Sequence, residues 1–96
     1  MLMLITYDVN TETREGRARL RRIAKACLNY GQRVQNSVFE CVLDWGQFLT
    51  LKSKLEKIID KNVDSLRYYN LGNNYKEKIC HIGAKPSINI EEPIVL

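Results

Sequence analysis

The sequence lacks an apolar segment long enough to cross a lipid bilayer, which takes about 20 residues. The apolar run at the N-terminus extends only from Met1 to Ile5, and no basic segment precedes it as in a signal peptide. We therefore expect a soluble, cytoplasmic protein with no membrane partner. Cysteine is also scarce: Cys27, Cys41 and Cys80 are odd in number and lack the paired spacing of a disulfide framework or a zinc finger. Buried free thiols are the simplest interpretation.

Several common catalytic and nucleotide-binding motifs are absent from the sequence. It contains no Walker P-loop, G-x-G-x-x-G, G-x-S-x-G or H-E-x-x-H pattern. His81 is the only histidine, so a His-Asp dyad would need Asp8 or Asp44 beside it, which the spacing does not indicate. With 96 residues, the chain fits a single domain over residues 1–96 and leaves little material for an enclosed cavity. Any chemistry is expected in an open groove or between subunits.

Positive charge is concentrated in one part of the chain. The sequence holds 15 Lys and Arg against 11 Asp and Glu, a formal net charge of +4. Residues 14–33 contain one acid, Glu15, and seven cations: Arg14, Arg17, Arg19, Arg21, Arg22, Lys25 and Arg33. Six of these are arginine, whose planar guanidinium matches phosphate oxygens. The pattern favours a polyanionic partner, and the alternative is a solvated basic helix face.

The first two predicted elements are a strand and a basic helix. Residues 2–7 form a short apolar run that stops at the turn formers after Tyr7, which is typical of a buried strand. A helix is predicted over 13–30, with Gly31 after its end. Its apolar stripe is Leu20, Ile23, Ala24, Cys27 and Leu28. Arg17, Arg21 and Lys25 form a row on the opposite side.

The later elements complete a two-layer fold. We expect one long strand over 33–43, a helix over 44–60 that begins with an Asp44/Gln47 capping box, and strands over 65–71 and 77–82 around a turn. We interpret the order as β-α-β-β-α-β, the ferredoxin-like α+β arrangement with two helices on one face of an antiparallel sheet. Because the other face stays uncovered, a homodimer is expected. Residues 86–96 are predicted as a fifth strand or tail that packs on the partner subunit.

Asp8 is the main candidate for metal chemistry. It directly follows the first strand, where a side chain can project toward a cleft. Mg²⁺ commonly takes one or two carboxylates together with waters and a substrate phosphate. A two-fold dimer would bring a second Asp8 close to the first, and a cation between them would relieve their repulsion. The alternative is that Asp8 only makes a local Asx turn or cap.

Residues around Asp8 complete a candidate nucleic-acid site. A metal there would lower the pKa of a bound water and stabilise phosphoryl charge. Arg33 and Ser37 have side chains suited to phosphate contact, and Phe39 is either a base-stacking residue or part of the core.

Three segments of the sequence resemble the CRISPR-associated Cas2 family, the small subunit of spacer-acquisition complexes. They are Leu4-Ile5-Thr6-Tyr7-Asp8-Val9, the basic helix that ends at Tyr30-Gly31, and Arg33-Val34-Gln35-Asn36-Ser37-Val38-Phe39-Glu40. The segments Gly72-Asn73-Asn74-Tyr75-Lys76 and His81-Ile82-Gly83-Ala84-Lys85-Pro86 are similar to the branch found with type I-C systems. The likeness covers essentially the whole chain.

The resemblance implies a ferredoxin-like homodimer that bridges two dimers of the Cas1 integrase, and a metal-dependent endonuclease activity. By this likeness Asp8 and its symmetry mate would bind Mg²⁺, with Mn²⁺ as a second candidate, and Tyr7 would join Asp8 in catalysis. The R-x-Q-x-S-V-F segment corresponds to Arg33, Gln35, Ser37 and Phe39. The candidate nucleic-acid contacts on the basic helix are Arg17, Arg19, Arg21 and Arg22.

Three function hypotheses follow. The first is an Mg²⁺-dependent endonuclease in antiviral defence that cleaves double-stranded DNA or single-stranded RNA. The second is a non-catalytic adaptor that bridges Cas1 dimers and clamps duplex DNA. The third, a small-ligand regulatory domain on the same fold, is disfavoured by the crowding of arginines.

Overall fold

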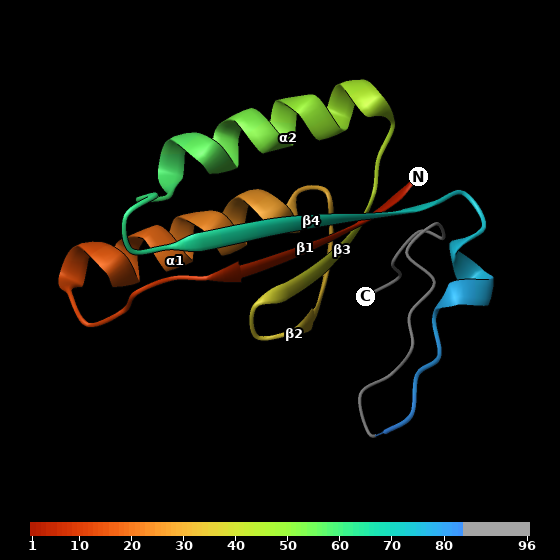
Figure 1. Cartoon of the computed structure of the whole chain (residues 1–96), viewed down its shortest axis with the longest axis horizontal. Coiled ribbons are helices and arrows are strands. Elements are labelled where there is room, and N and C mark those ends of the chain that lie inside the picture. The colour runs from red at the N-terminus through yellow and green to blue at the C-terminus, as the bar shows by residue number, and fades with distance from the viewer. Residues whose placement is uncertain (84–96) are drawn as a thin grey trace.

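The computed structural model describes residues 1–83, which form one sheet and one layer of helices (Figure 1). The predicted fifth strand within 86–96 lies outside the described residues. The elements, in chain order, are β1 (Leu2–Asp8), α1 (Arg14–Leu28), β2 (Gly31–Gln35), β3 (Val38–Val42), α2 (Trp45–Ile58), β4 (Ser65–Gly72) and the short 3-10 helix η1 (Tyr75–Lys78). No helix within these residues is both long enough and apolar enough to span a membrane.

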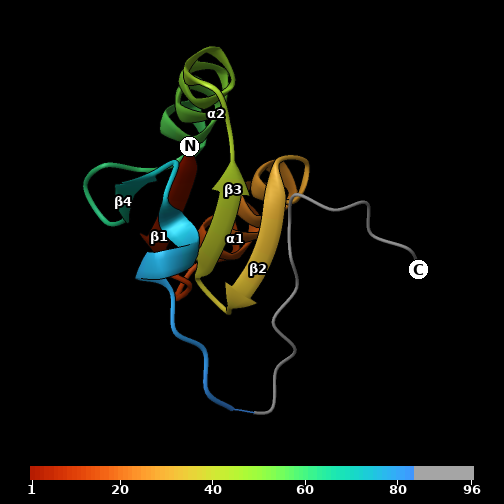
Figure 2. The same ribbon diagram turned by 90° about the vertical axis from the view of Figure 1, so that its right-hand side faces the viewer.

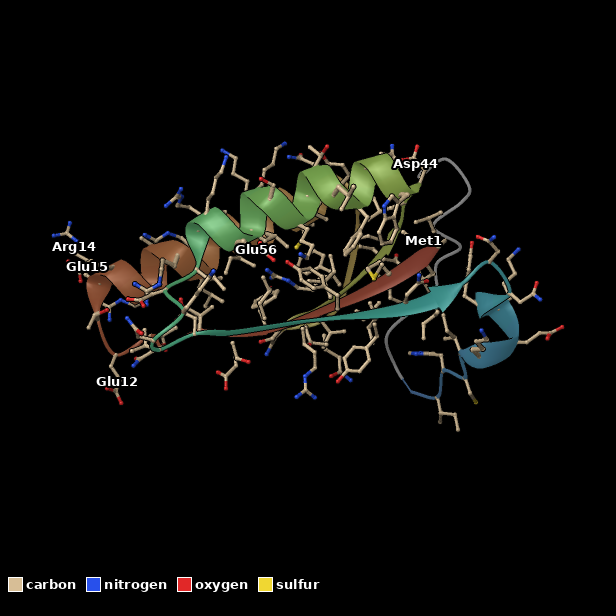
Figure 3. The ribbon with its side chains drawn as sticks, turned by 45° about the horizontal axis from the view of Figure 1, so that its top comes forward. Met1, Glu12, Arg14, Glu15, Asp44 and Glu56 are labelled. Atoms are coloured by element: carbon tan, nitrogen blue, oxygen red, sulfur yellow. The ribbon has the colours of Figure 1, made fainter. Side chains whose placement is uncertain are left out.

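The four strands form one antiparallel sheet in the order β2-β3-β1-β4. Both helices lie on the same face of this sheet (Figure 1), and β2 forms one edge beside β3 (Figure 2). Figure 3 shows Asp44 and Arg14 at opposite ends of the helix layer, so α1 and α2 run in opposite directions. The predicted ferredoxin-like α+β fold is confirmed, with the order β-α-β-β-α-β.

Two of the individually predicted strands are wrong. Residues 33–43 were expected as one strand, but the chain reverses at Asn36 and Ser37, and β2 and β3 pair as a hairpin with Gln35 opposite Val38. Residues 77–82 were expected as a strand, but the chain forms η1 instead. Asn36 and Ser37 are both residue types that favour turns, but strand-forming residues continue on both sides of them, so the break was overlooked. This hairpin supplies the two middle strands of the ferredoxin order.

Local hydrogen bonds explain where the helices begin. The Thr13 side chain accepts a hydrogen bond of 3.0 Å from the Gly16 N–H at the beginning of α1. The predicted capping box of α2 is present: the Gln47 N–H donates to Asp44 over 2.7 Å, and the Asp44 N–H donates to Gln47 over 3.0 Å. Both caps satisfy backbone donors that the first turn of a helix leaves free.

The core lies between the sheet and the two helices. Ile5, Phe39, Ile23, Leu51 and Leu55 are completely buried there, so each layer contributes to one cluster. Burial of large apolar side chains of this kind is the main favourable term in folding.

One side chain of the predicted stripe on α1 does not reach the core. Leu28 is 57% exposed in the last turn of the helix.

The thiols of Cys27 and Cys41 are free and buried as expected, whereas Cys80 is free and exposed. Burial raises the pKa of both Cys27 and Cys41 to about 12, which makes these thiols unreactive.

Candidate nucleic-acid interface and metal site

Asp8 is the last residue of β1, and its side chain is exposed. Met3, Ile5 and Tyr7 point into the core, so the alternating positions of β1, including Thr6 and Asp8, belong to the face of the sheet without helices. Asp8 pairs with Ser65 at the beginning of β4. The Asp8 carboxylate has no hydrogen bond or ion pair with any residue of the described part, and is therefore free to take a ligand.

A pocket of about 290 Å³ lies beside Asp8 and draws its walls from β1, β4 and the beginning of β3. Its lining consists of Thr6, Tyr7, Asp8, Ser37, Val38, Ser65, Arg67 and Tyr69. The lining combines hydroxyl groups with a single carboxylate and a single guanidinium. Polar and apolar atoms line this open pocket in similar proportion, and its charged side chains are Asp8 and Arg67.

One copy of the chain supplies few metal ligands. Within residues 1–83, no group of three or more His, Cys, Asp or Glu side chains is placed to hold a metal ion. Asp8 is the single carboxylate of the pocket. A hard cation such as Mg²⁺ accepts this kind of site, because waters, substrate phosphate and a second carboxylate can complete its oxygen shell. Within the described residues, one copy therefore offers such an ion a single carboxylate ligand at this pocket.

Tyr7 lies beside Asp8 in the sequence but faces the core. It is 4% exposed, and its ring stacks on the Phe39 ring with 6.1 Å between centroids. Its hydroxyl donates to the Asn36 carbonyl over 3.1 Å, and its backbone N–H donates to the Ser37 carbonyl over 3.1 Å. Burial raises the pKa of the Tyr7 hydroxyl, and the nearby Arg33 guanidinium opposes that shift. Tyr7 therefore holds the hairpin turn that carries Ser37 into the pocket.

The other predicted residues of the hairpin divide between surface and core. Arg33 is exposed, and its guanidinium carbon lies 5.3 Å from the centroid of the Phe39 ring. Phe39 is completely buried, which favours the core interpretation given as an alternative to base stacking. Ser37 is half-buried and lines the pocket, whereas Arg33 does not.

Arg19 differs from the other candidate arginines of α1. Its Nε donates to the Asp64 carboxylate over 2.7 Å, and the Asp64 side chain is fully buried. Asp64 also accepts from the backbone N–H groups of Asn10 over 3.0 Å and Asp60 over 2.8 Å. The hydrogen bond from Arg19 is the main cause that lowers the pKa of Asp64. Arg19 therefore ties α1 to the loops that follow β1 and α2.

The exposed cations of α1 are Arg14, Arg17, Arg21, Arg22 and Lys25. We call this set the basic surface of α1. Arg17 donates to the Thr11 carbonyl over 3.2 Å, and none of the set forms an ion pair within the described residues. This surface retains its charge for an anionic partner.

Five residues that line the pocket were not among the site residues predicted from the sequence: Thr6, Val38, Ser65, Arg67 and Tyr69. Arg67 and Tyr69 lie on β4, and the Arg67 guanidinium donates to the Tyr69 hydroxyl over 2.9 Å. The signal was the alternation of Ser65, Arg67 and Tyr69 with Leu66 and Tyr68, which places the first three on one face of a strand. Without the pairing of β4 with β1, nothing linked that face to Asp8.

Comparison with known proteins identifies the family. The model of the family described as CRISPR associated protein Cas2 matches residues 1–79. The chain belongs to the Cas2 family. This confirms the resemblance found in the sequence, while the type I-C branch stays a prediction.

Two curated Cas2 relatives match the chain over almost all of its length. The CRISPR-associated endonuclease Cas2 of Halalkalibacterium halodurans is 62% identical over 95 residues, which cover 99% of each chain. The CRISPR-associated endoribonuclease Cas2 of Chlorobaculum tepidum is 56% identical over 96 residues and all of both chains. Nuclease names are therefore attached to Cas2 relatives that share the whole domain.

Solved Cas2 structures share the fold. The crystal structure of Streptococcus pyogenes Cas2 at pH 6.5 superposes with a TM-score of 0.78 at 53% identity, covering 86% of this chain and 100% of that one. A structure described as cas2 gives a TM-score of 0.68 at 30% identity and covers 98% of each chain. The arrangement of strands and helices described above is thus the Cas2 arrangement.

Proposed function

We propose that the chain is a metal-dependent endonuclease of a CRISPR system that acts in the cytoplasm and hydrolyses phosphodiester bonds. The observation that carries the proposal is the exposed, unpaired carboxylate of Asp8 at a strand end, in an open pocket that it shares with Ser37 and Arg67. The nuclease names of relatives that cover the whole chain support it.

The active unit in this proposal is a homodimer. The sheet face without helices presents Leu4, Val38 and Tyr69 beside Asp8, and a second copy would remove apolar surface from water there. A two-fold axis would also supply the second carboxylate that the metal requires. In this proposal the dimer would cover the sheet face without helices and supply a second Asp8 carboxylate to the metal.

Each side chain has a distinct role in the proposed reaction. When bound, Mg²⁺ or Mn²⁺ lowers the pKa of a water and offsets charge on the phosphoryl oxygens. Asp8 would hold the ion, Ser37 would contact a phosphate oxygen from the pocket, and Tyr7 keeps the hairpin turn in place. Arg33, predicted as a phosphate contact, lies outside the pocket over the Phe39 ring, so in this proposal it can contact only a more distant part of the nucleic acid. Double-stranded DNA is the first substrate to test and single-stranded RNA the second.

Asp8→Asn tests the catalytic assignment, because the amide keeps the shape of the side chain and loses its charge. Cleavage of both substrates is measured across a Mg²⁺ series, with binding followed separately by fluorescence anisotropy. We expect cleavage to be lost and binding to be retained. Glu77→Gln removes one exposed charge from η1 and is the matched control. Undiminished cleavage by Asp8→Asn would refute the proposal.

The basic surface of α1 supports a second function, that of an adaptor that clamps duplex DNA and bridges dimers of the Cas1 integrase. Arginines without ion pairs on one helix can neutralise several phosphates at once. The adaptor predicts duplex binding that weakens steeply with salt and survives Asp8→Asn. Flat affinity between low and moderate salt would argue against it.

A further inference from the structure

The Asp8 carboxylate lies at a strand end that the sheet holds from one side. The pairing of β1 with β3 ends with Thr6 opposite Val38, whereas the pairing with β4 continues until Asp8 lies opposite Ser65. A metal ligand must be held within about 0.5 Å of its productive position. The position of Asp8 therefore depends on what holds the chain directly after it.

The next two residues of the chain are both anchored. Val9 is buried in the core. The N–H of Asn10 donates to Oδ1 of Asp64 over 3.0 Å, and the side-chain oxygen of Asn10 accepts from the N–H of Glu12 over 2.9 Å. The loop after Asp8 is thus tied to a carboxylate 54 residues further along the chain.

The carboxylate of Asp64 is itself fixed by further donors. Its Oδ2 accepts from Nε of Arg19 over 2.7 Å and from the N–H of Asp60 over 2.8 Å, while Nη2 of Arg19 donates to Oδ1 over 3.2 Å. The side chain is fully buried, and the following residue, Ser65, is the one that pairs with Asp8. One buried carboxylate therefore holds both segments that meet at Asp8, the loop after β1 and the beginning of β4.

We propose that Asp64, held by Arg19, is a positioning residue that fixes the Asp8 carboxylate for metal binding. The proposal rests on the proposed function, which makes Asp8 the metal ligand. Neither Asp64 nor Arg19 lines the pocket, and Arg19 belongs to the helix layer, so a second copy on the other face of the sheet leaves this arrangement intact. Arg19 then affects cleavage without touching nucleic acid.

Three variants test positioning, and a fourth is the control for lost stability. Asp64→Ala removes every acceptor, and Asp64→Asn keeps one oxygen for the N–H of Asn10 or of Asp60. Arg19→Lys keeps the charge of Arg19 and loses the two-pronged contact with the carboxylate. The matched control is Phe48→Leu, which leaves a cavity in the core. Phe48 is buried in the first turn of α2, at the opposite end of the helix from Asp60.

The experiment measures Mn²⁺ binding to the whole chain without nucleic acid, with Mn²⁺ in place of Mg²⁺ because EPR quantifies the free ion. Each variant is measured well below its melting temperature, so that folded proteins are compared. We expect Asp64→Ala to weaken Mn²⁺ binding roughly 10- to 100-fold, Asp64→Asn and Arg19→Lys to weaken it less, and Phe48→Leu to leave it unchanged. In the metal-free protein, the backbone amide of Asn10 should exchange its hydrogen faster in the Asp64 variants than in wild type.

Wild-type Mn²⁺ affinity in the Asp64 variants would overturn this role, and so would an equal loss of affinity in Phe48→Leu. If Asp64→Ala does not fold, Asp64→Asn and Arg19→Lys carry the same test. Failure of the proposed function looks different: Asp8→Asn would then bind Mn²⁺ and cut like wild type, while hydrogen exchange at Asn10 would still be faster in the Asp64 variants.

Discussion

Arg19 and Arg21 are two residues apart on α1 and have different surroundings. Arg19 donates to a buried carboxylate and joins α1 to the loops after β1 and α2. Arg21 is exposed and, within the described residues, makes no ion pair. The same residue type on the same helix is thus structural at one position and available to a ligand at the other. Charge counted along a sequence overstates the binding surface by the arginines that the fold uses internally.

The largest loss of stability should come from removing the carboxylate of the Arg19–Asp64 ion pair. Asp64→Ala would leave the Arg19 guanidinium and the N–H groups of Asn10 and Asp60 without their acceptor. We expect a loss of about 2–4 kcal/mol in the free energy of unfolding. Urea denaturation of the variant beside Arg21→Ala measures the contrast. Equal urea midpoints for Asp64→Ala and Arg21→Ala would show that the Arg19–Asp64 ion pair does not stabilise the fold.

Gly16→Ala tests the same loop without touching a charge. A Cβ at Gly16 would lie 1.8 Å from the Asn10 carbonyl oxygen, so the loop after β1 must move. We expect destabilisation on the order of 2 kcal/mol, as for other overpacked sites. Gly46→Ala is the matched control, since its nearest neighbour would be a side-chain oxygen of Asp44 at 3.4 Å. A wild-type melting temperature for Gly16→Ala would contradict the packing described here.

Acid should weaken the Arg19–Asp64 pair in a defined direction. The pKa of Asp64 is lowered below its usual 3.8, chiefly by the hydrogen bond from Arg19. The folded state therefore binds the proton less readily than the unfolded state, and the stabilisation is complete above pH 3.8. It is lost as the pH falls below that value through the folded-state pKa. Wild type should lose stability over this range more steeply than Asp64→Asn. Parallel curves would oppose the assignment.

Single changes on the basic surface of α1 should affect binding and leave folding alone. Arg21→Ala or Arg22→Ala should each reduce the slope of log duplex affinity against log salt by about 0.9, because one fewer phosphate is neutralised. The midpoint of thermal unfolding should stay at the wild-type value. Arg19→Ala should show the reverse pattern, with a lower midpoint and a smaller change in slope. If all three variants showed the same slope of log duplex affinity against log salt, Arg19 would bind nucleic acid as Arg21 and Arg22 do, contrary to this prediction.

The smallest effect is expected in thiol chemistry. Cys80 is exposed and should react readily with a thiol reagent, whereas burial raises the pKa of Cys27 and Cys41 to about 12. In Asp64→Asn, local opening should modestly accelerate modification of Cys27. Mass spectrometry of timed aliquots resolves the sites. Rapid labelling of Cys27 in the native wild type would be inconsistent with its burial.

Elements with a strong local signal were predictable. The capping box of Asp44 and Gln47 specifies the beginning of α2 through atoms three residues apart. The hairpin was missed because its turn, Asn36-Ser37, is stabilised from a distance: Tyr7 donates to both residues from β1. Leu28 fits the apolar period of α1 but extends past the core. Periodicity identifies a face of a helix and does not say where the neighbouring layer ends.

In the candidate site, too, some residues were predictable from local sequence and others depended on distant parts of the chain. Asp8 could be singled out because a carboxylate directly after a buried strand is a local pattern. Arg67 and Tyr69 could not, because they are far from Asp8 in the sequence and approach it only through the pairing of β4 with β1. The role of Arg19 depended on Asp64, which is 45 residues away.

The amino-acid sequence alone determined the fold class, the positions of both helices and the cap of α2, the concentration of arginine in one segment and the family of the chain. These depend on neighbours a few residues apart or on composition, which the chain carries in any conformation. Only the tertiary structure decided which arginines keep a free charge, that Phe39 and Tyr7 belong to the core, and which residues of β4 surround Asp8. Burial and pairing between distant residues exist only once the layers have packed.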